Sequence, residues 1–275
     1  MTLGCYDGAG TAMALARRLP VAAWLTYWRL WRCYFRYTVE GLHHLDGGRA
    51  AMIVGYHGRP IAYDMCMLTV VLYDRLGYLP HGVVHRGLEV ASPLTWAIDA
   101  LGFITRDGEA FARAVARGEH VMVTPGGGME GCRDFRSRYH VNWQKRTGYL
   151  RLACKYRLPI VPVAAAGADD TYIGLNDAEA LGRRLGVPRK WAWALWTGIG
   201  PLGLYPFSPP FPVRLRQLVG QPIDPWDGGA IAVDDDAALA RIHGVVVRAV
   251  QDLLDQARGI RAWESGWRMQ MTAGR

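Results

Sequence analysis

The sequence lacks several features that would assign a common class of protein at once. No CxxC pair is present, so neither a disulfide framework nor a zinc ribbon is supported. We expect reduced thiols at the five scattered cysteines, which are Cys5, Cys33, Cys66, Cys132 and Cys154. No G-x-S-x-G motif occurs, which excludes a nucleophile elbow. The glycine run at 126–128 lacks the Gly-Lys-Ser/Thr ending of a P-loop.

Signals for export and for internal repetition are also missing. The residues up to Met13 have no basic segment of the kind that begins a signal peptide, so we expect none there. The unpaired cysteines favour a protein that faces the cytosol. No internal repeat or low-complexity linker divides the 275 residues. That length fits one large domain, or one domain with an appendage.

The composition is that of a folded, basic chain with many aromatic residues. Hydrophobic residues make up 51% and charged residues 20% of the sequence, which excludes a disordered chain. The net charge of +8 comes almost entirely from arginine, and it suits anionic lipid, nucleic acid or phosphorylated substrates. Eleven tryptophans and thirteen tyrosines favour a membrane interface, where such rings settle. No recognisable nucleic-acid-binding module accompanies the charge, so we expect no nucleic acid.

The stretch from Ala50 to Asp64 organises our interpretation of the chain. Its apolar run 51–54 ends at Gly55 and predicts a buried strand of a parallel sheet. His57 follows in a turn with Gly58 and Pro60, and an apolar helix is expected over 65–76. Ligand sites in open α/β sheets lie just beyond the carboxyl ends of strands, where this histidine falls.

His57 and Asp64 are candidates for a general-base pair. A neutral imidazole takes a hydroxyl proton near pH 7, and a carboxylate on its other nitrogen fixes the tautomer. One continuous helix would hold the two residues about 10 Å apart, but the turn can fold Asp64 back. The alternative is a His and an Asp in an ordinary strand-to-helix loop.

Residues 20–37 combine aromatic rings with three arginines spaced as on one helix face: Arg29, Arg32 and Arg36. These arginines make a spanning helix costly, so we expect a helix that lies in the membrane interface with its arginines reaching phosphates. The alternative is an amphipathic helix packed on its own domain. The adjacent His43 and His44 would point to opposite faces of a strand, and His81 with His85 lacks a third ligand, so we expect no metal site.

Other segments carry weaker signals. Arg106, after a short strand at 102–104, is a candidate phosphate clamp, with an ordinary surface arginine as the alternative. Glycines Gly126 and Gly127 let the backbone approach a ligand as an anion nest, or simply make a turn after the strand at 120–124.

Pro162 within the apolar strand 158–163 predicts a sheet edge or a bulge. Residues 191–213 are expected to form an apolar loop near a membrane or over an acyl channel, and 234–257 a final amphipathic helix.

Four of these segments, taken in order, resemble the conserved blocks of the glycerolipid acyltransferase family. The first is GYHGRPIAYD, which is most similar to the branch resembling diacylglycerol acyltransferases; six residues separate His57 from Asp64, against four in common members. The others are GFITR with Arg106, PGGGMEGCR with Glu130 and Arg133, and LPIVPV with Pro162. The resemblance covers roughly residues 37–257.

The resemblance implies an α/β fold, a mostly parallel central sheet flanked by helices, behind an N-terminal membrane-associating helical segment. It divides the chain into that segment at 1–37, an acyltransferase domain at 38–258 and a C-terminal tail at 259–275. It implies O-acyl transfer from acyl-CoA or acyl carrier protein to a glycerolipid or other lipid hydroxyl, without a covalent intermediate. His57 would be the base and Asp64 its orienting partner.

The remaining roles implied by the resemblance concern the substrates. Arg106, Gly126, Gly127, Glu130, Arg133 and Pro162 would bind them. No cofactor beyond the acyl-CoA co-substrate and no metal would be needed. The protein would sit peripherally or monotopically on the cytoplasmic face of a membrane with anionic lipid. Two rival functions stay open: a thioesterase or lipid esterase that uses the same pair on water, and a non-catalytic lipid-binding protein.

Overall fold

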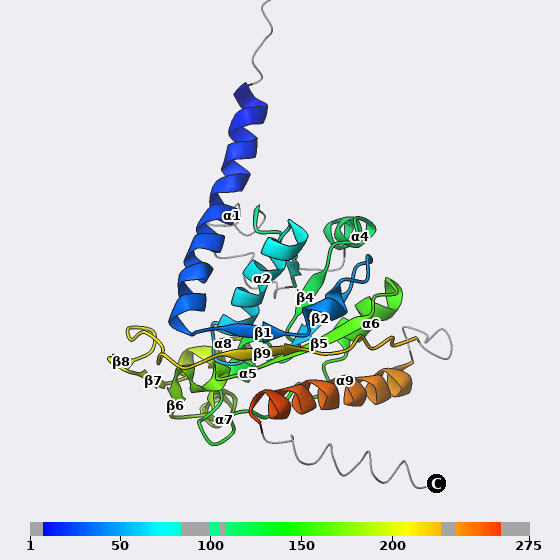
Figure 1. The fold of residues 1–275 in the computed structure, drawn as a ribbon. Coiled ribbons are helices and arrows are strands. Elements are labelled where there is room, and N and C mark those ends of the chain that lie inside the picture. Colours follow the sequence, from blue (N-terminus) through cyan, green and yellow to red (C-terminus); the bar gives the residue numbers. More distant parts are fainter. Residues whose placement is uncertain (1–7, 84–99, 105–107, 227–234, 260–275) are drawn as a thin grey trace, which may run out of the picture.

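The computed structural model describes residues 8–83, 100–104, 108–226 and 235–259, and it confirms the mostly parallel α/β architecture (Figure 1). The central sheet has six strands in the order β1-β9-β5-β2-β4-β3. Every neighbouring pair in this sheet is parallel except β5 with β9. The strands are β1 (Thr38–Glu40), β2 (Met52–Gly55), β3 (His81–Gly82), β4 (Val121–Val123), β5 (Ile160–Ala166) and β9 (Arg216–Val219).

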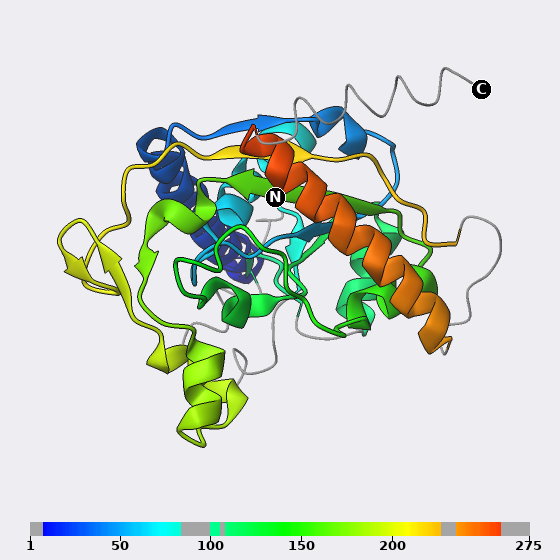
Figure 2. The ribbon, with the colours of Figure 1, turned by 90° about the horizontal axis from the view of Figure 1, so that it is seen from below.

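Helices cover both faces of this sheet, which explains why β2 and β5 are apolar without polar alternation. Helix α2 (Tyr63–Leu76) packs on one face, where it shares a core with Ile53 and Val161. The opposite face packs against α4 (Glu109–Ala116), α6 (Gly148–Lys155) and α9 (Asp236–Ala257). Figures 1 and 2 show α2 and α9 on opposite sides of the sheet.

Helix α9 is the amphipathic helix predicted near the C-terminus. The Asp235 side chain caps its first turn by accepting a hydrogen bond from the Ala238 N–H at 2.8 Å. Its buried residues recur at helical spacing and form one face toward β5; they include Leu239, Val246, Val250 and Leu254.

Strand β5 corrects the expectation that Pro162 marks a sheet edge. It lies inside the sheet, between β9 and β2, with Pro162 opposite Val54 in the parallel register. Antiparallel pairing with β9 begins one residue later, at Val163, so Pro162 lies at the end of that ladder, where it has no N–H to donate back to β9. The Pro162 carbonyl accepts a hydrogen bond from the Gly220 N–H at 2.8 Å.

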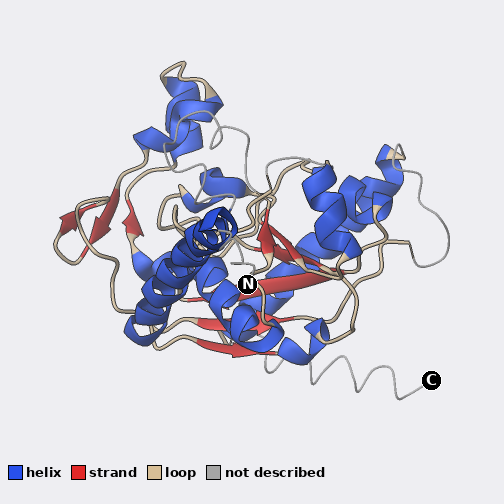
Figure 3. Cartoon of the chain, turned by 90° about the horizontal axis from the view of Figure 1, so that it is seen from above, coloured by secondary structure: helices blue, strands red, loops and turns tan. Residues whose placement is uncertain are grey.

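Residues 168–204 form a smaller subdomain at one side of the molecule (Figure 3). Its antiparallel sheet contains β6 (Ile173–Gly174), β7 (Gly198–Gly200) and β8 (Gly203–Leu204). Its helical elements are η3 (Ala168–Thr171), α7 (Ala178–Arg184), α8 (Arg189–Ala192) and η4 (Trp193–Leu195). One further short helix, η1 (Leu42–Leu45), belongs to the main domain and follows β1. The predicted apolar loop at 191–213 is therefore partly structured, as a helical turn and a β-hairpin.

Helix α1 (Gly8–Tyr34) is longer than predicted and contains Pro20. Its inner face packs on the domain through Leu25, Trp28 and the neighbouring Phe35. Figure 1 shows it rising beside α2 and extending beyond the domain.

The arginines of this segment are used differently from the prediction. Arg29 and Arg32 both form ion pairs with Asp74 of α2, at 2.6 and 3.5 Å. Arg36 lies past the helix and donates to the Pro212 carbonyl at 3.0 Å. These side chains join the helix to its own domain, as in the alternative interpretation. Among the described residues, no helix is long and apolar enough to cross a membrane.

Candidate active site

His57 lies two residues beyond the end of β2, at the carboxyl edge of the sheet where the sequence placed it. Its side chain is buried. Both of its backbone groups are held by long-range contacts: the N–H donates to Glu130 Oε2 at 3.1 Å, and the carbonyl accepts from Arg133 Nη2 at 3.0 Å. The loop that carries the imidazole is therefore fixed from both sides.

The imidazole itself is poorly paired. Its Nδ1 atom is buried without a hydrogen-bond partner. Burial lowers the pKa of His57 to about 4, against opposing effects of a backbone hydrogen bond and of the Asp169 charge. The ring is therefore neutral near pH 7, which is the form that can accept a proton.

Asp64 lies in the first turn of α2 and is fully buried. Burial raises the pKa of its carboxyl to about 7. Neither carboxyl oxygen has a hydrogen-bond partner, and no hydrogen bond or ion pair joins Asp64 to His57 in the part of the chain that the structure describes. The fold thus leaves the His57 Nδ1 atom and the Asp64 carboxyl oxygens without the contact predicted between the two residues.

Glu130, in α5 (Gly127–Gly131), supports the histidine loop. Besides the His57 N–H, its carboxylate accepts from the Asn142 N–H at 3.1 Å and from Trp143 Nε1 at 3.0 Å. Burial raises the pKa of Glu130 to about 8, and these three hydrogen bonds work against that rise. The carboxylate therefore joins the loop after β2 to the segment around residue 142.

The glycines before Glu130 serve this packing. A Cβ atom at Gly126 would overlap the Glu130 carboxylate, so only glycine lets that side chain approach. Gly127 has φ +60°, and its N–H donates to the Thr124 carbonyl at 2.9 Å. Because that amide is engaged within the turn, the anion nest expected here cannot use it.

The side chain of Arg133 is buried beside His57 and holds several backbone groups of the site together. Its guanidinium donates to the His57 and Glu130 carbonyls and to the Tyr56 hydroxyl. It also lies 3.5 Å from Asp169 Oδ2 in a buried ion pair. The predicted role as a free anchor for a phosphate does not fit a guanidinium with so many protein partners, although Arg133 also borders a polar cavity of about 170 Å³.

The sequence did not predict the buried polar cluster around Arg133, which consists of Tyr56, Arg59, Arg133, Tyr139 and Asp169. Asp169 accepts from the Tyr56 hydroxyl and from the Tyr139 N–H, and it lies 3.9 Å from Arg59 Nε. Arg59 also donates to the Arg133 carbonyl at 2.7 Å. The only available signal was the position of Arg59 beside His57, because its partners lie 74 and 110 residues away.

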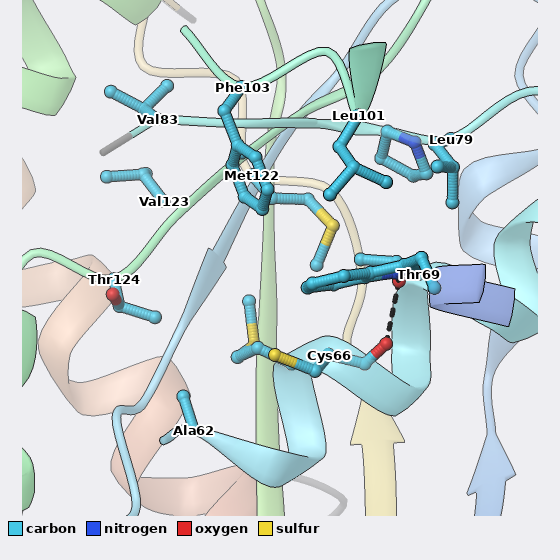
Figure 4. Close-up of a pocket in the computed structure, with 14 residues that line it drawn as sticks. Ala62, Cys66, Thr69, Leu79, Val83, Leu101, Phe103, Met122, Val123 and Thr124 are labelled. Carbon is cyan, nitrogen blue, oxygen red and sulfur yellow. Dashed lines mark hydrogen bonds between the residues drawn. The ribbon is translucent and has the colours of Figure 1, made fainter. Parts of the chain in front are cut away.

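An apolar cavity of about 160 Å³ lies between α1, α2 and the carboxyl ends of β3 and β4 (Figure 4). Its walls are aliphatic, aromatic and sulfur-containing side chains, among them Ala62, Met65, Cys66, Leu79, Phe103 and Met122. Trp24 of α1 contributes to the wall and donates to Thr69 Oγ1 at 2.9 Å. Strands β4 and β2 are parallel neighbours, so their carboxyl ends lie side by side. The cavity and His57 are therefore both at the carboxyl ends of the strands.

One predicted substrate-binding residue, Pro162, lies away from this cavity. The Pro162 ring packs near Gly220 and Leu253 of α9, on the sheet face opposite α2. Arg106 lies outside the described residues. No group of three or more metal-ligating side chains occurs within the described ranges.

Comparisons with known proteins agree with the blocks found in the sequence. Residues 36–166 match the family model "Acyltransferase". An uncharacterized protein of Mycobacterium tuberculosis is 27% identical over 231 residues, which are 81% of this chain and 62% of that protein. A Mus musculus protein named "DGAT1/2-independent enzyme synthesizing storage lipids" is 25% identical over 248 residues, which are 89% of this chain and 67% of that protein.

A solved structure was also found, that of the 1-acyl-sn-glycerophosphate (LPA) acyltransferase PlsC from Thermotoga maritima. It has a TM-score of 0.48 at 16% identity and covers 90% of this chain and 84% of its own. The chain spans less than two thirds of the length of the mycobacterial relatives. The stretch that holds His57, Asp64 and Glu130 is therefore similar to the acyltransferase family over residues 36–166.

Proposed function

We propose that the protein transfers a fatty acyl group from an acyl thioester to the hydroxyl group of a lipid, with His57 as the general base. The observation that carries this proposal is a buried, neutral histidine beyond the carboxyl end of β2, on the side of the sheet where the apolar cavity also lies. The match of residues 36–166 to the acyltransferase family supports the reaction class.

In this mechanism the acceptor hydroxyl attacks the thioester carbonyl directly. The imidazole Nε2 takes the hydroxyl proton as the carbon–oxygen bond forms. Loss of the thiolate regenerates the carbonyl, and the imidazolium returns the proton to the sulfur. The Asp64 carboxylate, turned onto Nδ1, would orient the ring and stabilise the imidazolium.

The hydrogen bonds of Glu130 and Arg133 to the His57 backbone are proposed to fix the base against the reacting groups. The Gly58 amide is the candidate donor to the oxyanion, because the Gly127 amide is engaged within its own turn.

The apolar cavity is proposed to hold the acyl chain. Its walls bury methylene groups at a gain of about 0.8 kcal/mol each, and they offer few polar atoms that would lose water. The polar cavity beside Glu130 and Arg133, with Arg146 and Arg189 on its walls, would take a polar part of a substrate.

The partners proposed are acyl-CoA or acyl carrier protein as donor and a glycerolipid or other lipid alcohol as acceptor. We propose a peripheral or monotopic position on the cytoplasmic face of a membrane. The relative named for storage-lipid synthesis favours a neutral lipid acceptor such as diacylglycerol.

The test is free-thiol release from a long-chain acyl-CoA, with and without a panel of lipid alcohols, for the wild type and His57→Ala. Acceptor-dependent release that falls by about a hundredfold or more in the variant supports the transferase. Release that is independent of every acceptor would indicate a thioesterase instead. If acyl-CoA and acyl carrier protein both give no release that depends on His57, the enzyme proposal fails.

A further inference from the structure

Large apolar side chains are exposed at the tip of the small subdomain. Leu202 is 81% exposed and Phe207 is 93% exposed, on and just after the β7–β8 hairpin. Leu204, in β8, is also exposed. Figures 1 and 3 show this hairpin projecting from the body of the molecule. Apolar side chains gathered at a protruding hairpin mark an interaction surface, because no part of the chain that the structure describes buries them.

A second exposed apolar stripe runs along the outer face of α1. It consists of Leu19, Tyr27, Leu30 and Tyr34, which fall on one side of the helix by their spacing. The opposite side of α1 is the one packed on α2 through Leu25 and Trp28. This helix is therefore apolar on both faces, and only its inner face has a partner in the described fold.

Hydrogen bonds join the two surfaces. The Tyr34 hydroxyl, at the end of α1, donates to the Pro210 carbonyl at 2.7 Å. Arg36 donates to the Pro212 carbonyl at 3.0 Å. The segment that returns from the hairpin is thereby attached to the end of α1, which links the tip to the helix that carries the stripe.

The composition of the surrounding subdomain favours a lipid surface as the partner of the tip. Residues 185–213 contain no carboxylate. Their charged residues are Arg189 and Lys190 of α8, and Arg189 forms an ion pair with Glu179 at 3.1 Å. Lys190 Nζ lies 5.8 Å from the ring of Trp191, and both Trp191 and Trp193 are more than half exposed. A subdomain that carries exposed apolar, tryptophan and lysine side chains and no carboxylate in this stretch suits the boundary between acyl chains and anionic headgroups.

We propose that the hairpin tip, Leu202, Leu204 and Phe207, inserts into the surface of an anionic bilayer, with the outer stripe of α1 as the second contact. This extends the membrane association in the proposed function, but it is a binding property that can be measured without the reaction. It assigns to the 185–207 region a docking role separate from His57 and from the apolar cavity.

The experiment is co-sedimentation of the full chain with vesicles of phosphatidylcholine mixed with phosphatidylglycerol, and with phosphatidylcholine alone. The variants are Leu202→Ser/Phe207→Ser and the control Val245→Ser, which removes an exposed apolar side chain from α9. The wild type and the control should bind the mixed vesicles more tightly than phosphatidylcholine alone. The double variant should bind the mixed vesicles about tenfold less tightly or weaker, from the apolar area it no longer buries.

Because both substituted side chains are exposed, the double variant should keep the wild-type Tm, and acyl release from a soluble short-chain donor should be unchanged. A double variant that binds vesicles as well as the wild type would overturn the proposal and leave α1 as the contact. Sedimentation velocity without vesicles provides a second test. Concentration-dependent self-association that is lost in the double variant would assign the tip to a second copy of the chain instead. A loss of vesicle binding supports docking even if no acyl transfer is ever found.

Discussion

The carboxylate of Glu130 accepts a hydrogen bond from the backbone N–H of His57 at 3.1 Å, across 73 residues of sequence. The same oxygen, Oε2, accepts from the indole of Trp143 at 3.0 Å. The contact reaches the backbone of the candidate base and leaves its imidazole free. Glu130 is therefore a positioning residue, whose effect on the reaction passes through the placement of His57.

Glu130→Gln tests this positioning role. The variant keeps the shape of the side chain, but its NH2 group replaces one of the two oxygens that accept from His57, Asn142 and Trp143. Two donors then face each other, so the loop that carries His57 must shift. We expect kcat to fall at least about tenfold with little change in KM, because the chemistry depends on geometry within a fraction of an ångström. Trp143→Phe, which removes one donor and leaves the His57 contact, should lower kcat less. Equal losses in both variants would indicate general destabilisation of the fold.

Asp64 should make folding stability depend on pH. Its pKa is raised to about 7 by burial, from an ordinary value of 3.8. The folded state therefore binds the proton more tightly than the unfolded state, and the stability from this group is present at low pH and lost as pH rises through 7. Asp64→Asn removes the titration. We expect its free energy of unfolding, relative to wild type, to increase by roughly 2 kcal/mol between about pH 5 and pH 7.5 in urea titrations.

The same variant separates a catalytic from a structural role for Asp64. If the carboxylate orients His57 during the reaction, Asp64→Asn should lose activity by about a hundredfold while it gains stability above pH 7. Full activity in a stabilised variant would remove Asp64 from the mechanism. The control is Asp74→Asn, which loosens the exposed ion pairs with Arg29 and Arg32 and should leave activity unchanged.

The apolar cavity should set the length of the acyl chain. Cys66 lines its α2 wall, and Cys66→Phe would fill part of the 160 Å³ with a ring. We expect the ratio of kcat/KM for long over short acyl-CoA to fall by about tenfold, because one or two methylene groups lose their site. Cys66→Ala is the matched control and should keep the preference for long chains. An unchanged ratio in the phenylalanine variant would place the chain elsewhere.

The buried polar cluster should contribute more to stability than any surface ion pair. Asp169→Ala would leave the buried guanidinium groups of Arg59 and Arg133 without their shared carboxylate, at a cost of about 3–5 kcal/mol. Glu40→Ala breaks the exposed pair with Arg216 and should cost less than about 1 kcal/mol. Thermal unfolding of the two variants makes the comparison. Similar shifts in Tm would show that the cluster is not a determinant of the fold.

Much of the fold could be predicted because its signals are local. The apolar run 51–54 with Gly55, the Pro60 turn and the helix after it predict one strand-turn-helix unit, and the structure has it as β2 and α2. Aspartates before an amphipathic stretch predicted α9, where Asp235 caps the first turn. Pro162 was expected at a sheet edge or a bulge, but β5 lies inside the sheet. A proline is tolerated there because the β9 ladder begins at Val163, and the sequence of β5 does not specify where that pairing begins.

The sequence by itself determined the chemistry available to this protein: a histidine after a buried strand, a carboxylate seven residues later, and four blocks that resemble, in order, those of the glycerolipid acyltransferase family. The tertiary structure alone decided how those groups are used. It attached Glu130 and Arg133 to the His57 backbone, paired Arg29 and Arg32 with Asp74, and left the Leu202–Phe207 tip exposed. These outcomes depend on contacts between residues tens of positions apart. Spacing along the chain carries no information about them, whereas burial and hydrogen bonding in the folded state fix them.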